Sequence, residues 1–234
     1  MCFSAEASFA VGSLLLPAGA YCGHSAIRKC PAYVPLALIP VVFGIQQICE
    51  GVVWVGLNRP DGELVQKASL LYLQIALFFW PFWIPVSVLF LQSSRKKGLF
   101  IGAIALLGAV GGLALSLPLV LNPDLVETRI VGHSLGYEFA QSPALELMPW
   151  PIWKALYLAV IVIPVLMSDS KEVVGVGVIL ILLAAVSHFL YAFAYLSVWC
   201  FFAAFLSSYL CWHFYRMAPA TPGMQTAQYP EQAN

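Results

Sequence analysis

A carboxylate inside an apolar segment of membrane-spanning length is the feature that most constrains this chain. The stretch Phe43–Leu57 reads FGIQQICEGVVWVGL and places Glu50 in its middle. An ionised carboxylate is costly within a bilayer, so such a residue usually faces the interior of a helix bundle, finds a partner or stays protonated. At helical spacing Gln47, Glu50 and Trp54 fall on one face, with Gln46 near its edge. The stretch therefore predicts a membrane helix with one polar side.

The composition is typical of a polytopic membrane protein. Residues of the AVILMFWYC set make up 61% of the chain and charged residues 9%. The apolar letters come in blocks of about 20, the length that crosses roughly 30 Å of hydrocarbon. No polar block is long enough to fold separately, which predicts one all-α helix bundle over residues 1–216. Residues 217–234, rich in Pro, Ala and Gln without periodicity, predict a flexible cytoplasmic tail.

The apolar blocks predict about seven transmembrane helices. The last two blocks are the least clearly divided, because no Gly or Pro marks a turn between them. One long kinked helix at that place would lower the count to six. The predicted spans are Ala7–Cys22, Ala32–Leu57, Lys67–Gln92, Leu99–Leu121, Ile152–Met167, Val173–Tyr195 and Ser197–Tyr215.

The positions of Lys and Arg predict the orientation, since cytoplasmic loops collect these residues. With seven spans the N-terminus lies outside and the C-terminus inside, and the first helix, which lacks a positively charged leader, is retained. We expect a multi-pass membrane protein, with membrane lipids as partners. The residues predicted to be cytoplasmic are Arg28, Lys29, Arg95, Lys96, Lys97, Lys171 and Arg216.

Two spans contain residues that shape helix packing. The run Trp80–Pro85 holds two prolines, which predicts a kink near mid-membrane and free backbone carbonyls that need partners. Gly108 and Gly111–Gly112 give the next span a small-residue surface suited to close helix approach.

The longest connection, Asn122–Pro151, lies outside the membrane in this topology. Its apolar and polar letters partly alternate, and Gly132 and Gly136 suit turns, so we expect a short hairpin or lid over the outer mouth of the bundle.

Once the spans are oriented, several polar residues fall at similar depth in the outer half of the membrane. They come from three helices: Glu50 with Gln47, Gln74, and His188 with Tyr191. A carboxylate near a histidine in a low dielectric can share a proton, coordinate a metal or hold a polar ligand. Two interpretations stay open, a binding pocket and neutral hydrogen-bonded groups that fasten helices together.

Several other kinds of site find little support. The six cysteines are scattered, without CxxC or finger-like spacing, and no phosphate-loop or HExxH motif occurs. A zinc site would need Glu50, His133 and His188 together, so we expect no metal site. Cys2 and Cys200 are either a disulfide on the oxidising face or independent thiols. No basic cluster of the kind that would bind nucleic acid is present, so nucleic acid is not an expected partner.

Four stretches of the chain resemble those of a known family. They are the opening MCFSAEASF, the segment from Gln47 to Trp54, the segment from His133 to Tyr137, and SVWCFFAA from Ser197 to Ala204. In these residues the chain resembles a family of uncharacterised bacterial integral-membrane proteins whose members begin Met-Cys-Phe-Ser. The similarity extends to Arg216 and leaves the tail outside. It implies the membrane topology and singles out the matched residues without assigning them roles.

The helix count is also similar to that of the seven-span membrane hydrolases of the ceramidase and adiponectin-receptor type, which hold a catalytic zinc with histidines. Here the last span offers His213 and no His-x-x-x-His pair. A metal-dependent intramembrane hydrolase is therefore a minor alternative.

Together these patterns predict a membrane protein that binds a small ligand, lipid or cofactor in an outer-half polar pocket. Glu50 and His188 would be the polar anchors, Gln47 and Gln74 would orient them, and Trp54 and Tyr191 would form part of the wall. The alternative is a structural or accessory subunit of a larger membrane complex. The patterns identify neither the cofactor nor a catalytic residue, and they leave open whether the protein is an enzyme.

Overall fold

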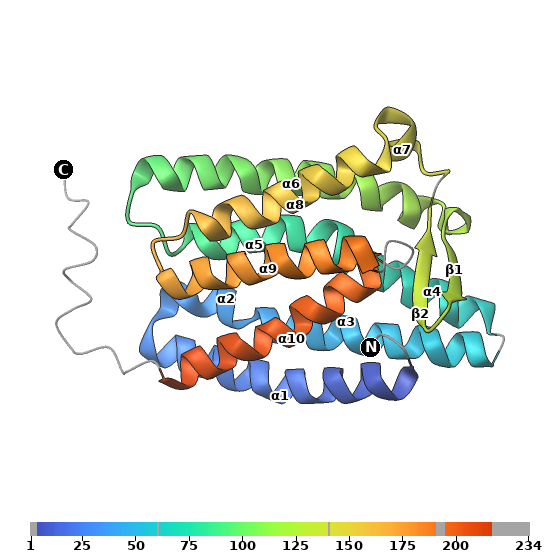
Figure 1. Ribbon diagram of the computed structural model, residues 1–234, viewed down its shortest axis with the longest axis horizontal. Helices are drawn as coiled ribbons and strands as arrows, with labels where there is room; N and C mark the ends of the chain where they lie inside the picture. Colours follow the sequence, from blue (N-terminus) through green and yellow to red (C-terminus); the bar gives the residue numbers. More distant parts are fainter. Residues whose placement is uncertain (1–3, 60, 140, 191–194, 217–234) are drawn as a thin grey trace.

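The computed structural model describes residues 4–59, 61–139, 141–190 and 195–216, and these are mostly helical (Figure 1). Two strands, β1 (Glu127–Val131) and β2 (Ser134–Glu138), interrupt the helices. The helices are α1 (Ala5–Lys29), α2 (Val34–Ala37), α3 (Ile39–Asn58), α4 (Gly62–Leu73), α5 (Trp80–Leu89), α6 (Arg95–Leu121), α7 (Pro143–Leu147), α8 (Trp150–Leu166), α9 (Lys171–Leu190) and α10 (Tyr195–Arg216), with 3-10 turns at Pro31–Tyr33 and Pro123–Leu125. The predicted tail, Cys2 and Tyr191 lie outside the described residues.

Four helical segments in the described part of the chain are long and apolar enough to cross a membrane. They are Pro31–Asn58, Gly62–Leu89, Arg95–Leu121 and Lys171–Phe189. The predicted spans correspond to these segments together with α1, α8 and α10. The doubtful division near the C-terminus is resolved, because α9 and α10 are two helices that pack against each other.

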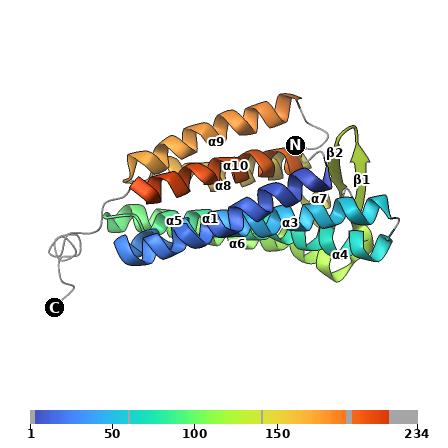
Figure 2. The ribbon, with the colours of Figure 1, turned by 90° about the horizontal axis from the view of Figure 1, so that it is seen from below.

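The helices lie roughly along one long axis, and α9 forms an outer layer beside α8 and α10 (Figure 2). α1 packs along α3. Glycines make this contact close: a Cβ at Gly19 would lie 2.6 Å from the Val41 nitrogen, and one at Gly12 would lie 2.9 Å from the Gly44 carbonyl oxygen. Small residues let membrane helices approach in this way. α3 is consequently held in the interior of the bundle.

The predicted break in the third span is present as a local change of helix type. A π-helical turn, Gln74–Phe79, lies directly before Trp80 and Pro81. Pro81 has no N–H to give to the preceding turn, and the Ala76 carbonyl instead accepts a hydrogen bond of 2.6 Å from the Tyr157 hydroxyl. Partners from other helices commonly satisfy carbonyls freed in this way.

The predicted small-residue surface of α6 packs against this irregular segment. A Cβ at Gly108 would overlap the Pro81 carbonyl oxygen, at 1.9 Å, and one at Gly112 would lie 2.8 Å from the Phe78 Cα. Both positions therefore require glycine for the approach of α6 to the π turn and α5.

The predicted hairpin is confirmed. β1 and β2 pair antiparallel, and Gly132 occupies the turn with φ +61°, a conformation that favours glycine. The expectation that Gly136 serves a turn is wrong, because Gly136 lies inside β2 and pairs with Arg129. Leu135 is fully buried against Val53 and Trp54 of α3, so the hairpin covers one end of the bundle.

Candidate functional site

Glu50 lies at the centre of a fully buried polar cluster. It accepts a hydrogen bond of 2.5 Å from the Ser197 hydroxyl of α10 and one of 3.3 Å from the Gln47 amide one turn earlier on α3. Glu50 and Gln47 are 0% exposed and Ser197 is 1% exposed. The helical spacing of Gln47 and Glu50 puts both on the face that α10 covers. This polar side of α3, predicted from the sequence, is confirmed.

The cluster continues to α5 through Gln46 and to α4 through Cys200, which lies beside Tyr72. The Gln46 Oε1 accepts a hydrogen bond of 2.8 Å from the Trp80 indole, whose ring stacks on Phe43 with centroids 4.0 Å apart. Cys200 on α10 is a buried free thiol that lies beside Gln46 and Tyr72. We call the set Gln46, Gln47, Glu50, Ser197 and Cys200 the polar centre.

Gln74 and Trp54, two of the predicted site residues, contact other parts of the bundle. Gln74 donates its amide N–H to the Ser116 carbonyl of α6 at 3.2 Å, so it ties the π turn to α6. Trp54 packs with Leu135 under the hairpin and is 6% exposed. Its indole nitrogen has no hydrogen-bond partner among the described residues.

His188 lies in a different environment from Glu50. It is exposed on α9, and its Nδ1 lies 2.8 Å from the Lys154 ammonium of α8. The same ammonium lies 3.9 Å above the ring of Tyr195. His188 thus belongs to a cluster at the edge of α8, α9 and the start of α10, whereas Glu50 accepts hydrogen bonds from Gln47 of α3 and Ser197 of α10.

The ligand set considered for zinc is not assembled. Glu50 is buried, whereas His133 is exposed in the hairpin turn and His188 is exposed on α9. Within the described ranges, no three His, Cys, Asp or Glu side chains come together in a group that could hold a metal ion.

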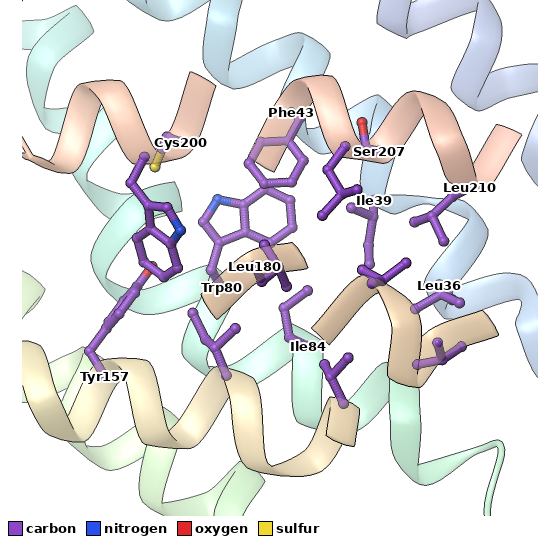
Figure 3. Close-up of a pocket in the computed structure, with 16 residues that line it drawn as sticks. Leu36, Ile39, Phe43, Trp80, Ile84, Tyr157, Leu180, Cys200, Ser207 and Leu210 are labelled. Atoms are coloured by element: carbon purple, nitrogen blue, oxygen red, sulfur yellow. The ribbon is translucent and has the colours of Figure 1, made fainter. Parts of the chain in front are cut away.

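An apolar cavity begins beside the polar centre and runs along the bundle (Figure 3). Its volume is about 60 Å³, which is room for several water-sized groups. Phe43, Trp80, Tyr157 and Cys200 gather at one end, and Leu36 and Leu210 lie at the other. The full lining is Leu36, Ile39, Phe43, Trp80, Ile84, Tyr157, Ile161, Val165, Val173, Val176, Leu180, Trp199, Cys200, Leu206, Ser207 and Leu210.

Polar atoms of the aromatic end differ in whether they have partners. The Trp80 indole donates to Gln46 and the Tyr157 hydroxyl donates to Ala76. Trp199 is 3% exposed, yet its indole nitrogen has no hydrogen-bond partner in the described part of the chain. An unsatisfied buried donor costs about 1–3 kcal/mol. A ligand that supplied an acceptor there would recover this free energy.

Comparison with known proteins gives a family. The family model described as "Family of unknown function (DUF6629)" matches residues 1–225. The chain belongs to this family. The match continues past Arg216, where the sequence resemblance was expected to end. No curated protein and no solved structure matches the chain.

In this DUF6629 member the polar centre and the cavity adjoin through shared residues. Cys200 belongs to both, and Trp80 lines the cavity while its indole is held by Gln46. The sequence pointed to Glu50 and Gln47 but missed Ser197 as a partner of Glu50 and Trp199 as a lining residue. The arrangement suits binding: an apolar body fits the cavity, and a hydrogen-bond acceptor fits its aromatic end.

Proposed function

We propose that this DUF6629 member is a seven-span bacterial inner-membrane protein, with its N-terminus outside, that binds one lipid-like molecule in the cavity. The cavity with an unpartnered indole N–H at its aromatic end is the observation that carries the binding role. Glu50 and Gln47 build the polar wall behind that end. In this proposal His188, Gln74 and Trp54 support neighbouring surfaces rather than the cavity lining.

The topology is supported by contacts that gather the predicted cytoplasmic residues at one end. The Lys29 ammonium at the end of α1 donates to the Phe214 carbonyl near the end of α10 at 3.0 Å. Asp169, just before α9, accepts hydrogen bonds from Ser93 and Lys97 at the start of α6. These connections lie opposite the hairpin (Figure 1). Lys and Arg at this end favour its cytoplasmic location.

The position of α9 supports entry of the ligand from the bilayer. The cavity is lined on one side by α9, through Val173, Val176 and Leu180. Only 28% of the residues in the apolar 18-residue stretch of this helix are buried. The cavity admits a short stretch of chain as it stands. A longer ligand would displace α9 outward into the lipid.

Photolabelling tests the binding role. A hydrocarbon chain carrying a diazirine would be added to the purified protein in detergent, irradiated, and its attachment mapped by mass spectrometry. We expect saturable labelling of cavity-lining residues of α9 and α10. Leu180→Trp, which fills the cavity, should raise the probe concentration needed for half-maximal labelling about tenfold.

Leu182→Trp is the matched control. Leu182 is on the same helix and 61% exposed, whereas Leu180 is 8% exposed and lines the cavity. The control should label like the wild type. Labelling that never saturates, or that both variants leave unchanged, would overturn the binding role.

The alternative, an accessory subunit, is supported by the exposed apolar face of α6, which either lipid or another chain can cover. Native mass spectrometry after gentle extraction separates the two roles, because a bound small molecule supports the first and co-extracted subunits the second. The exposed residues of this face are Leu99, Phe100, Leu106, Leu107, Val110, Leu113, Leu117, Val120 and Leu121.

A further inference from the structure

We propose that the molecule bound in the cavity carries a flat, uncharged ring with a carbonyl oxygen, the chemistry of an isoprenoid quinone. This inference rests on the proposed binding function and specifies the class of ligand.

The aromatic end of the cavity provides flat surfaces for a ring. Phe43 and Trp80 form a stacked pair, with ring centroids 4.0 Å apart and planes 25° apart. At the same end Tyr157 meets Trp199 edge to face, with centroids 5.4 Å apart. Aromatic side chains prefer offset-stacked or edge-to-face partners. A planar ring between these pairs would gain contacts that a bare alkyl chain does not make.

The hydrogen-bonding capacity at this end calls for an acceptor. Trp80 and Tyr157 already donate to Gln46 and Ala76, and the Ser207 hydroxyl farther along donates to the Ala204 carbonyl at 2.6 Å. The Trp199 indole nitrogen is the lining donor without a partner among the described residues. An indole N–H can only donate. The complementary ligand atom is therefore an acceptor such as a carbonyl oxygen.

The electrostatics favour a neutral head group. No Lys, Arg, His, Asp or Glu is among the described residues that line the cavity. A phosphate or carboxylate would be desolvated there without an opposite charge, which is strongly unfavourable. A quinone carbonyl accepts a hydrogen bond and needs no counter-charge.

The opposite end of the cavity suits the branched chain of an isoprenoid. Its walls are aliphatic, with Leu36, Ile39, Ile84 and Leu210 among them. Such surfaces bind methyl and methylene groups through burial and close contact. The two ends together match a ring at one end of a molecule and a hydrocarbon chain at the other.

Competition against the diazirine probe tests the ligand class. Three competitors share a ten-carbon chain and differ in the head: a decyl-substituted benzoquinone, decylbenzene and decyl phosphate. In the wild type the quinone should halve labelling at a concentration about tenfold below those of the other two. In Trp199→Phe the advantage of the quinone over decylbenzene should disappear. Trp212→Phe, which changes an exposed tryptophan outside the cavity, should keep that advantage.

The wild-type comparison alone can overturn the inference, so the test does not depend on the folding of any variant. Decyl phosphate or decylbenzene competing as well as the quinone would refute the neutral carbonyl ring, while saturable labelling would leave the proposed binding function intact. Retention of the quinone advantage in Trp199→Phe would refute the role of the indole. Absence of saturable labelling would refute both the binding function and this inference.

Discussion

α3 and α9 are both long apolar helices, yet they lie in opposite surroundings. In an apolar 18-residue stretch of Pro31–Asn58, 67% of the residues are buried, compared with 28% in the corresponding stretch of Lys171–Phe189. The polar side chain of each helix follows this difference, because Glu50 is 0% exposed and hydrogen-bonded inside the bundle, whereas His188 is exposed at its edge. Apolarity therefore identifies a span, and packing decides what its polar residues do.

The largest expected difference in unfolding free energy is between the variants that replace Glu50 and His188 separately with leucine. Glu50→Leu leaves the Ser197 hydroxyl and the Gln47 amide without their acceptor. Since each orphaned buried donor costs roughly 1–3 kcal/mol, the variant should lose about 2–6 kcal/mol of unfolding free energy. His188→Leu should change it by less than about 0.5 kcal/mol, as is usual at exposed positions. Reversible unfolding in mixed detergent micelles measures both.

Glu50→Gln sharpens this comparison. The amide keeps an acceptor oxygen for Ser197 but can present an N–H to Gln47, so its loss should fall between those of the wild type and Glu50→Leu. Equal losses for Glu50→Leu and His188→Leu would contradict the contrast between a central and a peripheral helix.

Replacing glycines gives a second contrast, in which the unfolding free energy should fall at one position and rise at the other. A Cβ at Gly19 of α1 would lie 2.6 Å from the backbone nitrogen of Val41 in α3, whereas one at Gly175 of α9 meets nothing within 4 Å. Gly19→Ala should destabilise the protein by about 1–3 kcal/mol because the α1–α3 contact cannot relax. Gly175→Ala should stabilise it by up to about 1 kcal/mol through helix propensity. The same unfolding measurement applies, and a loss at Gly175 would show that α9 is packed more tightly than described.

Much of the fold follows from local sequence patterns. Apolar blocks marked the long helices, the run Trp80–Pro85 marked the irregular third segment, and Gly108 and Gly112 marked a close helix contact. Alternation and Gly132 marked the hairpin. Each of these features depends on residues near one another in the chain, so a single sequence contains the necessary information.

The partner of Glu50 could not be obtained in the same way. Depth along the membrane placed Glu50 and His188 at similar levels, but depth does not specify the rotation of a helix or its neighbours in the bundle. α9 and α10 are adjacent in sequence, and nothing local shows that α10 faces α3 while α9 lies outside. Ser197 also gave no signal, since a serine within a helix can bond its own backbone. A cavity lined by six helices, α2, α3, α5, α8, α9 and α10, is likewise invisible to local patterns.

The smallest expected effect concerns how α9 is anchored. Asp169 precedes α9, and hydrogen bonds from Lys97 and then from Ser93 hold the pKa of its carboxyl well below the usual value. A lowered pKa means that the charged form stabilises the fold fully above the ordinary aspartate pKa of about 3.9, and that this contribution is lost as pH falls toward the folded-state pKa.

The Asp169 side chain is 30% exposed, so Asp169→Asn should cost only about 0.5–1 kcal/mol of unfolding free energy at neutral pH. The difference in unfolding free energy between this variant and the wild type should shrink below about pH 4. Unfolding curves between pH 3 and 7 measure the difference, with the exposed Glu127→Gln in β1 as control. A difference that stays constant with pH would mean that the carboxylate charge does not anchor α9 and that the Ser93 and Lys97 contacts act only through geometry.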